Sequence, residues 1–348
     1  MKGSMQRVRA VIDGDQPDRT PLYDLLRNDA VLSHFAGETL SLENAPEVVF
    51  RAYEPAVDAT RPAVRLPGEE KTVTLPDGRK QRHLRWTVWT EPVRYPDPEA
   101  YARAKRDLLE QADFTWGPDQ DRQIADFLAD VDTHRHRLGE VYFLPAAGSV
   151  SLGGLYMEIG LEMFSYVLAD YPDLINDLLE YQTRFIVGWI EHLPPDHGLH
   201  GVTVFDDIAY KTGPFLSPTW FERNYLPRLA LVMDAYHARG IKVQFHSDGN
   251  LMPILDGLVD AGIDGLNPLE VLAGMDAGEI HRRHPHLFLT GGIDVSQLLP
   301  YGTPAQIRDA VHRAIDAAEG RIMIGSSTEL NNEVPLRNYL ALREAVLA

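Results

Sequence analysis

The sequence predicts an α/β fold, a (β/α)8 barrel of the TIM type, and two observations indicate it. Short apolar runs alternate with helical segments through the second half of the chain, which is the pattern of repeated βα units around a parallel sheet. Two apolar runs near the amino terminus bring the candidate strands to eight, as a closed barrel requires. A chain of 348 residues with 44% hydrophobic residues can bury the core of one such domain. We therefore expect a single domain over residues 5–348.

Each candidate strand is a short apolar run bounded by polar or glycine-containing segments. In chain order the expected strands are residues 21–25, 57–66, 141–146, 202–205, 242–245, 265–267, 287–290 and 322–324. Residues 65–93 break the alternation, because a turn signal at Pro76-Asp77-Gly78 lies between two β-rich stretches. We expect a β-hairpin inserted in the barrel near residues 65–93, as a candidate lid.

The helices between these strands carry their own boundary signals. Thr303 followed by Pro304 and Gln306 is a capping box with proline at the first helical position, and Gly320 supplies a left-handed stop. Ser217-Pro218 begins another helix, and Pro227 is expected to kink it. Residues 173–193 form a third, amphipathic segment.

Composition excludes several classes of function. Thirty-three basic against fifty-one acidic residues give a net charge of −18, which disfavours nucleic acid as a partner. No cysteine is present, so thiolate nucleophiles, iron–sulfur clusters and thiolate-bound zinc are excluded. The chain has no apolar run of the ~20 residues that a membrane helix needs, and no signal-peptide pattern. We expect a cytoplasmic protein without membrane contact.

Polar side chains close five successive candidate strands. In a parallel barrel the carboxyl ends of all strands meet on one rim, where the chemistry of such proteins is found. These side chains are therefore expected to converge on one acidic pocket of ionisable groups that divide acid and base roles. They are Asp206 and Asp207, then His246 and Asp248, then Asn267 and Glu270, then Asp294, and finally Ser327 and Glu329.

Each of these residues also has a structural interpretation. Asp206 or Asp207 could cap a helix, and Asp248-Gly249 is a common turn pair. Hydroxyl groups such as that of Ser327 usually cap helices at a strand-to-helix junction. For His246 and Glu270 we favour a functional role, because a core histidine more often lies within a strand and glutamate is rarely buried without a partner.

His246 and Glu270 are chemically suited to bind a divalent metal, zinc or another ion, with Asp248 or Asp206 as the third ligand. A metal-free proton relay through the same residues is the alternative, and spacing does not separate the two. The sequence contains no GxGxxG motif, P-loop, HExxH helix or GxSxG elbow, which disfavours nucleotide binding, zinc proteolysis and serine hydrolysis.

Six motifs spread over nearly the whole chain resemble the uroporphyrinogen decarboxylase-like superfamily, which includes corrinoid-linked methyltransferases. The resemblance implies a (β/α)8 barrel, in agreement with the strand count. The motifs are Pro17-Asp18-Arg19-Thr20-Pro21, Leu155-Tyr156-Met157-Glu158, Phe205-Asp206-Asp207, Phe245-His246-Ser247-Asp248-Gly249, Leu266-Asn267-Pro268-Leu269-Glu270 and Gly291-Gly292-Ile293-Asp294.

Departures from the family pattern argue against uroporphyrinogen as the substrate. The true decarboxylases resemble one another in an arginine-rich loop that holds propionate groups, and at most Arg27 remains of it here. Their essential aspartate falls near Arg65 and their late histidine near Ser327, whereas Tyr156 matches their pocket tyrosine. The thiol-directed methyltransferases resemble one another in a His-x-Cys pair, which is His246 and Asp248 in this chain, so a thiol methyl acceptor is not expected.

The resemblance implies an enzyme that transfers a methyl group from a small O- or N-methylated metabolite to a corrinoid or folate acceptor. We assign catalysis to Asp206, Asp207, His246, Asp248 and Tyr156, with Lys211 neutralising the aspartates. Substrate binding is assigned to Lys211, Asn267, Asp294, Ser327, Glu329 and Arg27.

Other functions and partners stay open. A lyase or decarboxylase of a small carboxylate is the first alternative, and a non-catalytic metabolite-binding barrel is the second. No corrinoid-binding segment lies in this chain, so a separate corrinoid carrier protein is the expected partner. The oligomeric state is also left open, with a homodimer as one option.

Overall fold

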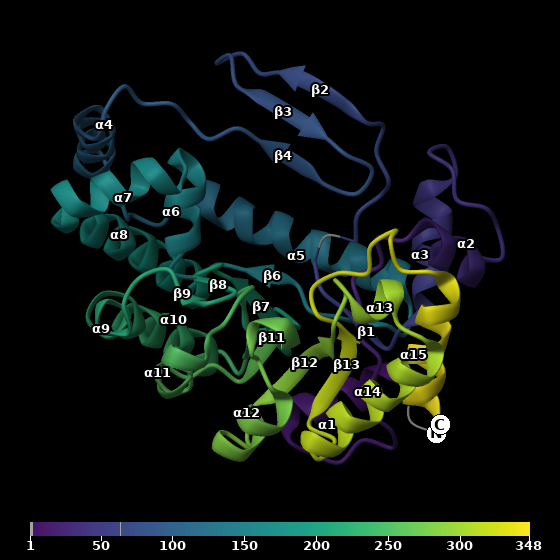
Figure 1. Ribbon diagram of the computed structural model, residues 1–348. Helices are drawn as coiled ribbons and strands as arrows, with labels where there is room; N and C mark the ends of the chain where they lie inside the picture. Colours follow the sequence, from purple (N-terminus) through teal and green to yellow (C-terminus); the bar gives the residue numbers. More distant parts are fainter. Residues whose placement is uncertain (1–2, 63) are drawn as a thin grey trace.

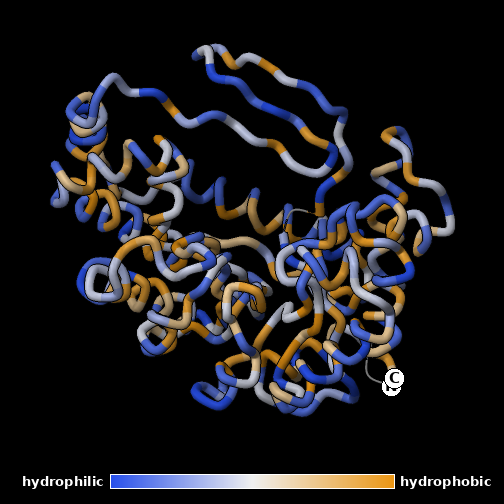
Figure 2. The backbone as a smooth tube through the Cα atoms, viewed as in Figure 1, coloured by the Kyte–Doolittle hydropathy of each residue, from blue (hydrophilic) through white to orange (hydrophobic). Residues whose placement is uncertain are grey.

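The computed structural model describes residues 3–62 and 64–348, and its centre is a parallel sheet surrounded by helices (Figure 1). Six strands pair in the order β13-β12-β11-β10-β7-β6. Their bounds are β6 Ala146–Ala147, β7 Gly201–Phe205, β10 Lys242–His246, β11 Gly265–Leu269, β12 Phe288–Ile293 and β13 Ile322–Ser326. The predicted mixed α/β fold with a parallel sheet is confirmed. Figure 2 shows hydrophobic positions concentrated in these central strands.

The amino-terminal part of the predicted barrel is less regular than expected. β1 (Ala59–Thr60) and β5 (Tyr142–Phe143) form a separate parallel pair. The expected first strand, residues 21–25, is present only as single bridges, in which Leu22 pairs with Ile324 and Tyr23 with Ala59. The assigned strands therefore do not form one continuous barrel, although these bridges connect the pair to β13.

Proline explains where the other two expected strands are shortened. Proline has no amide hydrogen and cannot donate to a strand ladder. Pro62 follows β1 closely, so the expected strand at 57–66 is regular for only two residues. Pro145 separates β5 from β6, so the expected strand at 141–146 is split into two short ones.

The helices that cover the sheet follow their boundary signals. Thr303 and Gln306 form the expected capping box at α14, and Ser217 caps α9 through the amide of Trp220. A π-helical turn, η1 (Phe221–Tyr225), precedes Pro227. The remaining bounds are α1 Ser4–Asp13, α2 Asp29–Ala36, α3 Ala45–Ala56, α4 Pro98–Glu110, α5 Pro118–Leu138, α6 Leu152–Ile159, α7 Leu161–Asp170, α8 Pro172–Glu191, α9 Pro218–Trp220, α10 Leu226–Ala238, η2 Met252–Ile254, α11 Leu255–Asp260, η3 Val271–Ala273, α12 Ala277–Arg283, α13 Leu298–Tyr301, α14 Pro304–Ala317 and α15 Leu336–Leu347.

The segment expected to be a hairpin has a third strand. β2 (Lys71–Thr74), β3 (Lys80–His83) and β4 (Val88–Thr90) form an antiparallel sheet that lies apart from the central one, at the top of Figure 1. Most of its side chains are exposed. A second antiparallel pair, β8 (Ala209–Tyr210) and β9 (Gly213–Pro214), follows β7. In the described part of the chain, no helix has the length and apolar character needed to cross a membrane.

Candidate active site

His246 is the last residue of β10 and lies between two neighbouring strands in register. It pairs with Phe205 of β7 on one side and with Asn267 of β11 on the other. The three residues therefore lie side by side at the carboxyl edge of the sheet. Asp206 and Asp207 continue from β7, and Ser247 and Asp248 continue from β10, so the expected convergence at this edge occurs for these residues.

A hydrogen bond fixes the orientation of the His246 ring. Its Nδ1 lies 2.7 Å from Oδ1 of Asn267. An amide oxygen can only accept, so Nδ1 carries the hydrogen and Nε2 of the neutral ring keeps its lone pair. Burial holds the pKa of His246 well below its ordinary value, and the nearby Arg61 charge acts in the same direction. The neutral imidazole therefore presents Nε2 as a ligand or base.

Two carboxylates face Nε2 of His246. Oδ1 of Asp207 lies 3.8 Å from it and Oδ1 of Asp248 lies 4.0 Å from it. The Asp248 oxygen is buried and has no hydrogen-bond partner among the described residues. Burial raises the pKa of Asp248 to about 7, and the charges of Asp207 and Glu270 add to this effect. Two acidic groups and one imidazole thus share this site, and Arg61 is the nearby cation that lowers the pKa of Asp248 against these effects.

These three side chains fit a divalent metal ion. Their donor atoms all lie within 4.8 Å of one another. Zinc binds nitrogen and oxygen ligands at about 2.0–2.2 Å, so ligand atoms of one ion lie at most about 4.4 Å apart, and the distances of 3.8 and 4.0 Å from His246 Nε2 to the two carboxylates fall below that limit. The Asn267 contact to Nδ1 is the outer-shell hydrogen bond that metal-binding histidines usually have. The unpartnered Asp248 oxygen is the atom that such an ion would satisfy.

Glu270 has a different position from the one we expected. Its Oε2 accepts a hydrogen bond from the amide of Gly249 at 3.0 Å. Gly249 has φ of +90°, and a Cβ there would lie 2.7 Å from the Ala209 backbone, so only glycine fits. Among the described donor atoms, Asp207 rather than Glu270 gathers with His246 and Asp248. Glu270 holds the loop that carries Asp248.

Asp206 and Asp207 are adjacent, but their side chains have different surroundings. Asp206 is buried and accepts hydrogen bonds from the amides of Leu152 and Gly153 at the start of α6 and from Tyr225 Oη. Burial raises its pKa to about 6. A Cβ on Gly153 would lie 2.9 Å from the Asp206 carboxylate, so the close approach requires glycine. Asp206 therefore joins α6 to the sheet, and Asp207 faces the imidazole.

Tyr156 lies on α6 and contacts the site through its hydroxyl group, which donates to the backbone oxygen of Asp207 at 3.0 Å. Burial raises the pKa of Tyr156, and the charge of Asp207 adds to this. The hydroxyl therefore stays protonated. Lys211, expected to neutralise the aspartates, is instead exposed in the turn between β8 and β9, and forms no ion pair with either within the residues described.

The other predicted substrate-binding residues bond mainly to the protein itself. Arg27 and Glu329 form an ion pair with each other. Ser327 Oγ accepts from the amide of Val295. Asp294 accepts hydrogen bonds from the Ser296 hydroxyl and the three amides of residues 296–298, which lower its pKa against the effect of burial.

Sequence reasoning missed two buried charged residues at this edge, Asp24 and Arg61. Asp24 accepts hydrogen bonds from Ser326 Oγ at 2.7 Å and from the amide of Leu25, and burial raises its pKa to about 7. Arg61 follows β1 directly and is 7% exposed. Both lie inside the segments expected to be strands, residues 21–25 and 57–66, rather than after them, so the search for polar residues that follow strands did not indicate them.

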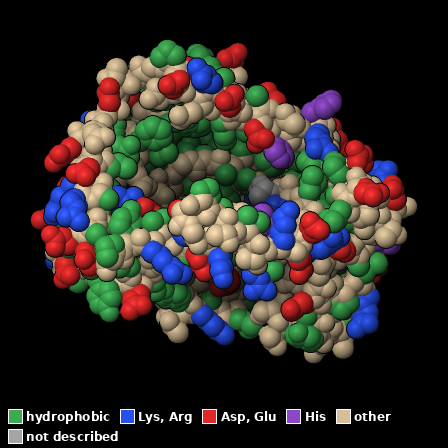
Figure 3. All heavy atoms as spheres, turned by 90° about the horizontal axis from the view of Figure 1, so that it is seen from above, with side chains coloured by type: hydrophobic (Ala, Val, Ile, Leu, Met, Phe, Trp, Pro, Cys, Tyr) green, Lys and Arg blue, Asp and Glu red, His purple; other side chains and the backbone are tan. Residues whose placement is uncertain are grey.

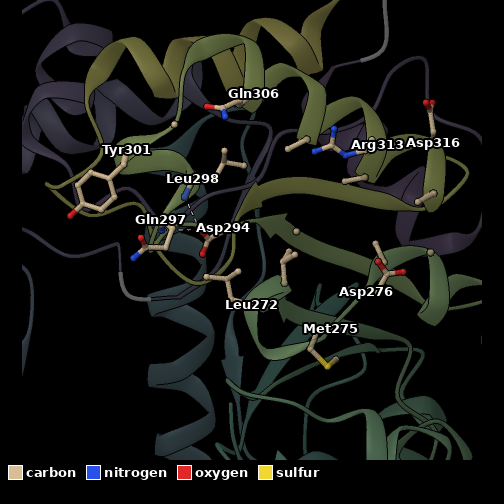
Figure 4. Close-up of a pocket in the computed structure, with 18 residues that line it drawn as sticks. Leu272, Met275, Asp276, Asp294, Gln297, Leu298, Tyr301, Gln306, Arg313 and Asp316 are labelled. Carbon is tan, nitrogen blue, oxygen red and sulfur yellow. Dashed lines mark hydrogen bonds between the residues drawn. The ribbon is translucent and has the colours of Figure 1, made fainter. Parts of the chain in front are cut away.

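The face that carries the site is hollowed. Figure 3 views the molecule from the side on which β2 to β4 lie in Figure 1, and hydrophobic side chains gather around the hollow. A separate pocket of about 1030 Å³ lies among η3, α12, α13 and α14 (Figure 4). Of the predicted site residues that the structure describes, only Asp294 lines it, so it is distinct from the histidine cluster.

The fold and the position of these side chains define an α/β protein with a central parallel sheet and a cluster of ionisable side chains at its carboxyl edge. The model of the family described as Uroporphyrinogen decarboxylase (URO-D) matches residues 118–348, which is more than half of the chain. The chain therefore belongs to the URO-D family, and the family suggested by its motifs is confirmed.

Several solved structures are similar to this chain, and one of them matches it over almost its whole length. It is described as "methyltransferase from Methanosarcina mazei", with a TM-score of 0.66 and 20% sequence identity, and the match covers 99% of this chain and 98% of that one. At this level of identity the likeness establishes the fold. No curated protein sequence matches this chain.

Proposed function

We propose that this protein is an enzyme that removes a methyl group from a small O- or N-methylated metabolite. The observation that carries the proposal is the group formed by His246 Nε2, Asp207 and Asp248 at the carboxyl edge of the sheet. The likeness to a methyltransferase structure supports the choice of methyl transfer within the family. The acceptor is a corrinoid or a folate, with the corrinoid delivered by a separate carrier protein.

His246, Asp207 and Asp248 would hold a divalent cation, zinc being the first candidate. A bound cation supplies Lewis acidity to the methylated oxygen or nitrogen. Asn267 keeps the imidazole in the tautomer that presents Nε2, and Glu270 holds the Asp248 loop through Gly249. Tyr156 keeps the backbone of Asp207 in place.

The proposed reaction needs one proton, which is taken up by the leaving heteroatom. The bond between the methyl carbon and the heteroatom breaks, the methyl group bonds to the nucleophile of the acceptor, and the heteroatom leaves with the electron pair. That heteroatom then takes up a proton, which the carboxyl groups at this edge can deliver.

The test is a methyl-transfer assay with zinc-loaded protein, a panel of methoxylated and N-methylated compounds, and either cob(I)alamin or tetrahydrofolate as acceptor. Formation of methylcobalamin is followed by its absorption spectrum, and methyltetrahydrofolate by chromatography. We expect at least one methylated compound to react, and H246A to lose about 100-fold or more of the rate. H237A is the matched control, because His237 pairs with Asp264 on the surface.

Two results of this assay contradict the proposal. One is that no compound transfers its methyl group to either acceptor. The other is that H246A keeps the rate of the wild type while its melting temperature is unchanged.

A decarboxylase of a small carboxylate is the second candidate, because the raised pKa of Asp248 lets this group hold a proton near neutral pH. Such an enzyme releases carbon dioxide from its substrate without any methyl acceptor. Measuring carbon dioxide in the same panel, with cob(I)alamin and folate omitted, separates the two functions.

A further inference from the structure

Arg61 is a buried cation for which the described residues provide no ion pair. It follows β1 at the carboxyl edge of the sheet and is 7% exposed. Across residues 3–62 and 64–348, no carboxylate forms a salt bridge with it, and its Nε has no hydrogen-bond partner. Buried charges are nearly always paired, because leaving water is costly for an ion. An arginine held in this way indicates a partner that arrives from outside the chain.

The guanidinium group lies beside the histidine cluster. Its central carbon is 5.2 Å from the centre of the Phe205 ring, and the same ring is 4.7 Å from the ring centre of His246. These two distances place the guanidinium carbon within about 10 Å of the imidazole centre. The charge of Arg61 also lowers the pKa of both His246 and Asp248.

Neighbouring arginines already have partners, which sets Arg61 apart. Arg27 forms its ion pair with Glu329. Arg65 donates to the backbone oxygen of Trp86 and to Thr87 Oγ1. A second unpartnered donor lies in the same area, since the buried side-chain nitrogen of Asn267 has no acceptor among the described residues. Arg61 Nε and the Asn267 side-chain nitrogen thus both adjoin the cluster without an acceptor among the described residues.

We propose that Arg61 binds the carboxylate of the substrate, so that the substrate class is a small methylated carboxylic acid. The planar fork of a guanidinium matches a carboxylate and can form two parallel hydrogen bonds with it. In a protein of net charge −18, an anion needs such a short-range partner. The spacing fits a compact molecule whose carboxylate meets Arg61 while its methylated oxygen or nitrogen reaches His246. The methyl-transfer part rests on the proposed function, whereas the carboxylate site itself does not.

The experiment measures equilibrium binding by isothermal titration calorimetry without any methyl acceptor. The probes are two matched pairs, 4-methoxybenzoate with 4-methoxybenzamide and N,N-dimethylglycine with N,N-dimethylglycinamide, and benzoate serves as a probe without a methyl group. We expect the wild type to bind at least one carboxylate about 10-fold or more tightly than its amide. R61Q should remove this preference and leave amide affinity unchanged.

R321Q is the matched control, because Arg321 is a partly buried arginine that also has an unpartnered Nε but lies beside Lys242 and Asp264, at the opposite ends of the strands. R321Q should keep the preference for the carboxylate. A wild type that binds neither member of each pair, or an R61Q variant that keeps the preference, overturns the proposal.

The melting temperature of R61M gives an independent reading. A cation kept for an external ligand destabilises the empty protein, so R61M should melt at a higher temperature than the wild type. A large decrease would show that Arg61 serves the fold and would overturn the proposal. Tight carboxylate binding without methyl transfer would leave the Arg61 site standing and remove the proposed function. Equal methyl transfer from acids and amides would support the proposed function and overturn the Arg61 carboxylate site.

Discussion

His246 and Asn267 pair across two neighbouring strands, and the imidazole Nδ1 lies 2.7 Å from the amide oxygen. The side chain of Asn267 is almost fully buried, so water does not compete for this bond. Because the hydrogen bond fixes the tautomer, it determines which nitrogen of His246 faces Asp207 and Asp248. The chemistry of the site thus depends on a residue that does not belong to the group of metal-capable donors.

Replacing Asn267 with alanine should weaken metal binding without unfolding the protein. The imidazole would lose the bond that orients it, and loss of such an outer-shell partner typically costs 10- to 100-fold in metal affinity. Zinc affinity is measured by competition with a chromophoric chelator. N338A is the control, because Asn338 is an equally buried amide that donates to Leu299 and Gly302 away from the cluster. Equal zinc affinity in N267A and the wild type would show that Asn267 does not position His246.

The buried carboxyl group of Asp24 should make stability depend on pH. Its pKa is about 7 in the folded protein, against about 4 in an unfolded chain, so folding takes up a proton between these values. The stability that this group contributes is present below about pH 4 and is lost as the pH rises through about 7. D24N cannot titrate, so its unfolding free energy should rise relative to that of the wild type between pH 4 and 7.

Urea denaturation of the two proteins at several pH values checks this. Asp58 and Asp294 have lowered pKa values and act in the opposite direction, but both proteins contain them, so their effect cancels in the difference. A difference that stays constant from pH 4 to 7 would mean that Asp24 is ionised throughout.

Replacing Gly249 with alanine should destabilise the loop that carries Asp248. The backbone at Gly249 is left-handed, and a Cβ would lie 2.7 Å from the backbone of both Ala209 and Tyr210. The conformational strain and the steric clash together should cost at least ~2 kcal/mol of unfolding free energy. In G78A only the conformational cost of about 1 kcal/mol applies, because nothing lies within 4 Å of that position. Similar losses in the two variants, measured by urea denaturation, would refute this account of the loop.

Asp29 should hold the three-stranded sheet β2 to β4 against the rest of the molecule. Its carboxylate accepts hydrogen bonds from Trp86 Nε1 at 3.0 Å and Arg85 Nε at 2.9 Å. D29A should expose the segment, so that trypsin cleaves at Arg79 or Lys80 about 10-fold faster than in the wild type. E38A removes an exposed ion pair with Arg51 and should not change this rate. If D29A is cleaved no faster than E38A, the contacts of Asp29 do not hold the sheet in place.

Much of the fold follows from patterns that are local in the sequence. The apolar runs predicted β7, β10, β11, β12 and β13, because each of these strands is short, buried and closed by polar residues. The weaker predictions fall where proline interrupts the backbone ladder, at Pro62 and Pro145, or where single bridges replace a strand at Leu22 and Tyr23. The local sequence pattern does not determine how many residues of such a run pair with a neighbouring strand.

The site was predictable as a region and less so in its contacts. The rule that polar residues close parallel strands located Asp207, His246 and Asp248. It did not locate Asp24 and Arg61, because both lie inside the segments expected to be strands, residues 21–25 and 57–66. The same rule could not separate Asp206 from Asp207, because the first binds the start of α6 and the second faces the imidazole. The ion pair of Arg27 with Glu329 joins residues from opposite ends of the chain, so a local pattern does not predict it.

The most direct test of the central claim is the zinc stoichiometry of metal-free protein after incubation with zinc and removal of the unbound ion. If His246, Asp207 and Asp248 form one metal centre, the wild type retains about one equivalent, and H246A and D248N retain almost none while melting within a few degrees of the wild type. A wild type that retains almost no zinc, or an H246A variant that retains as much as the wild type, would contradict it.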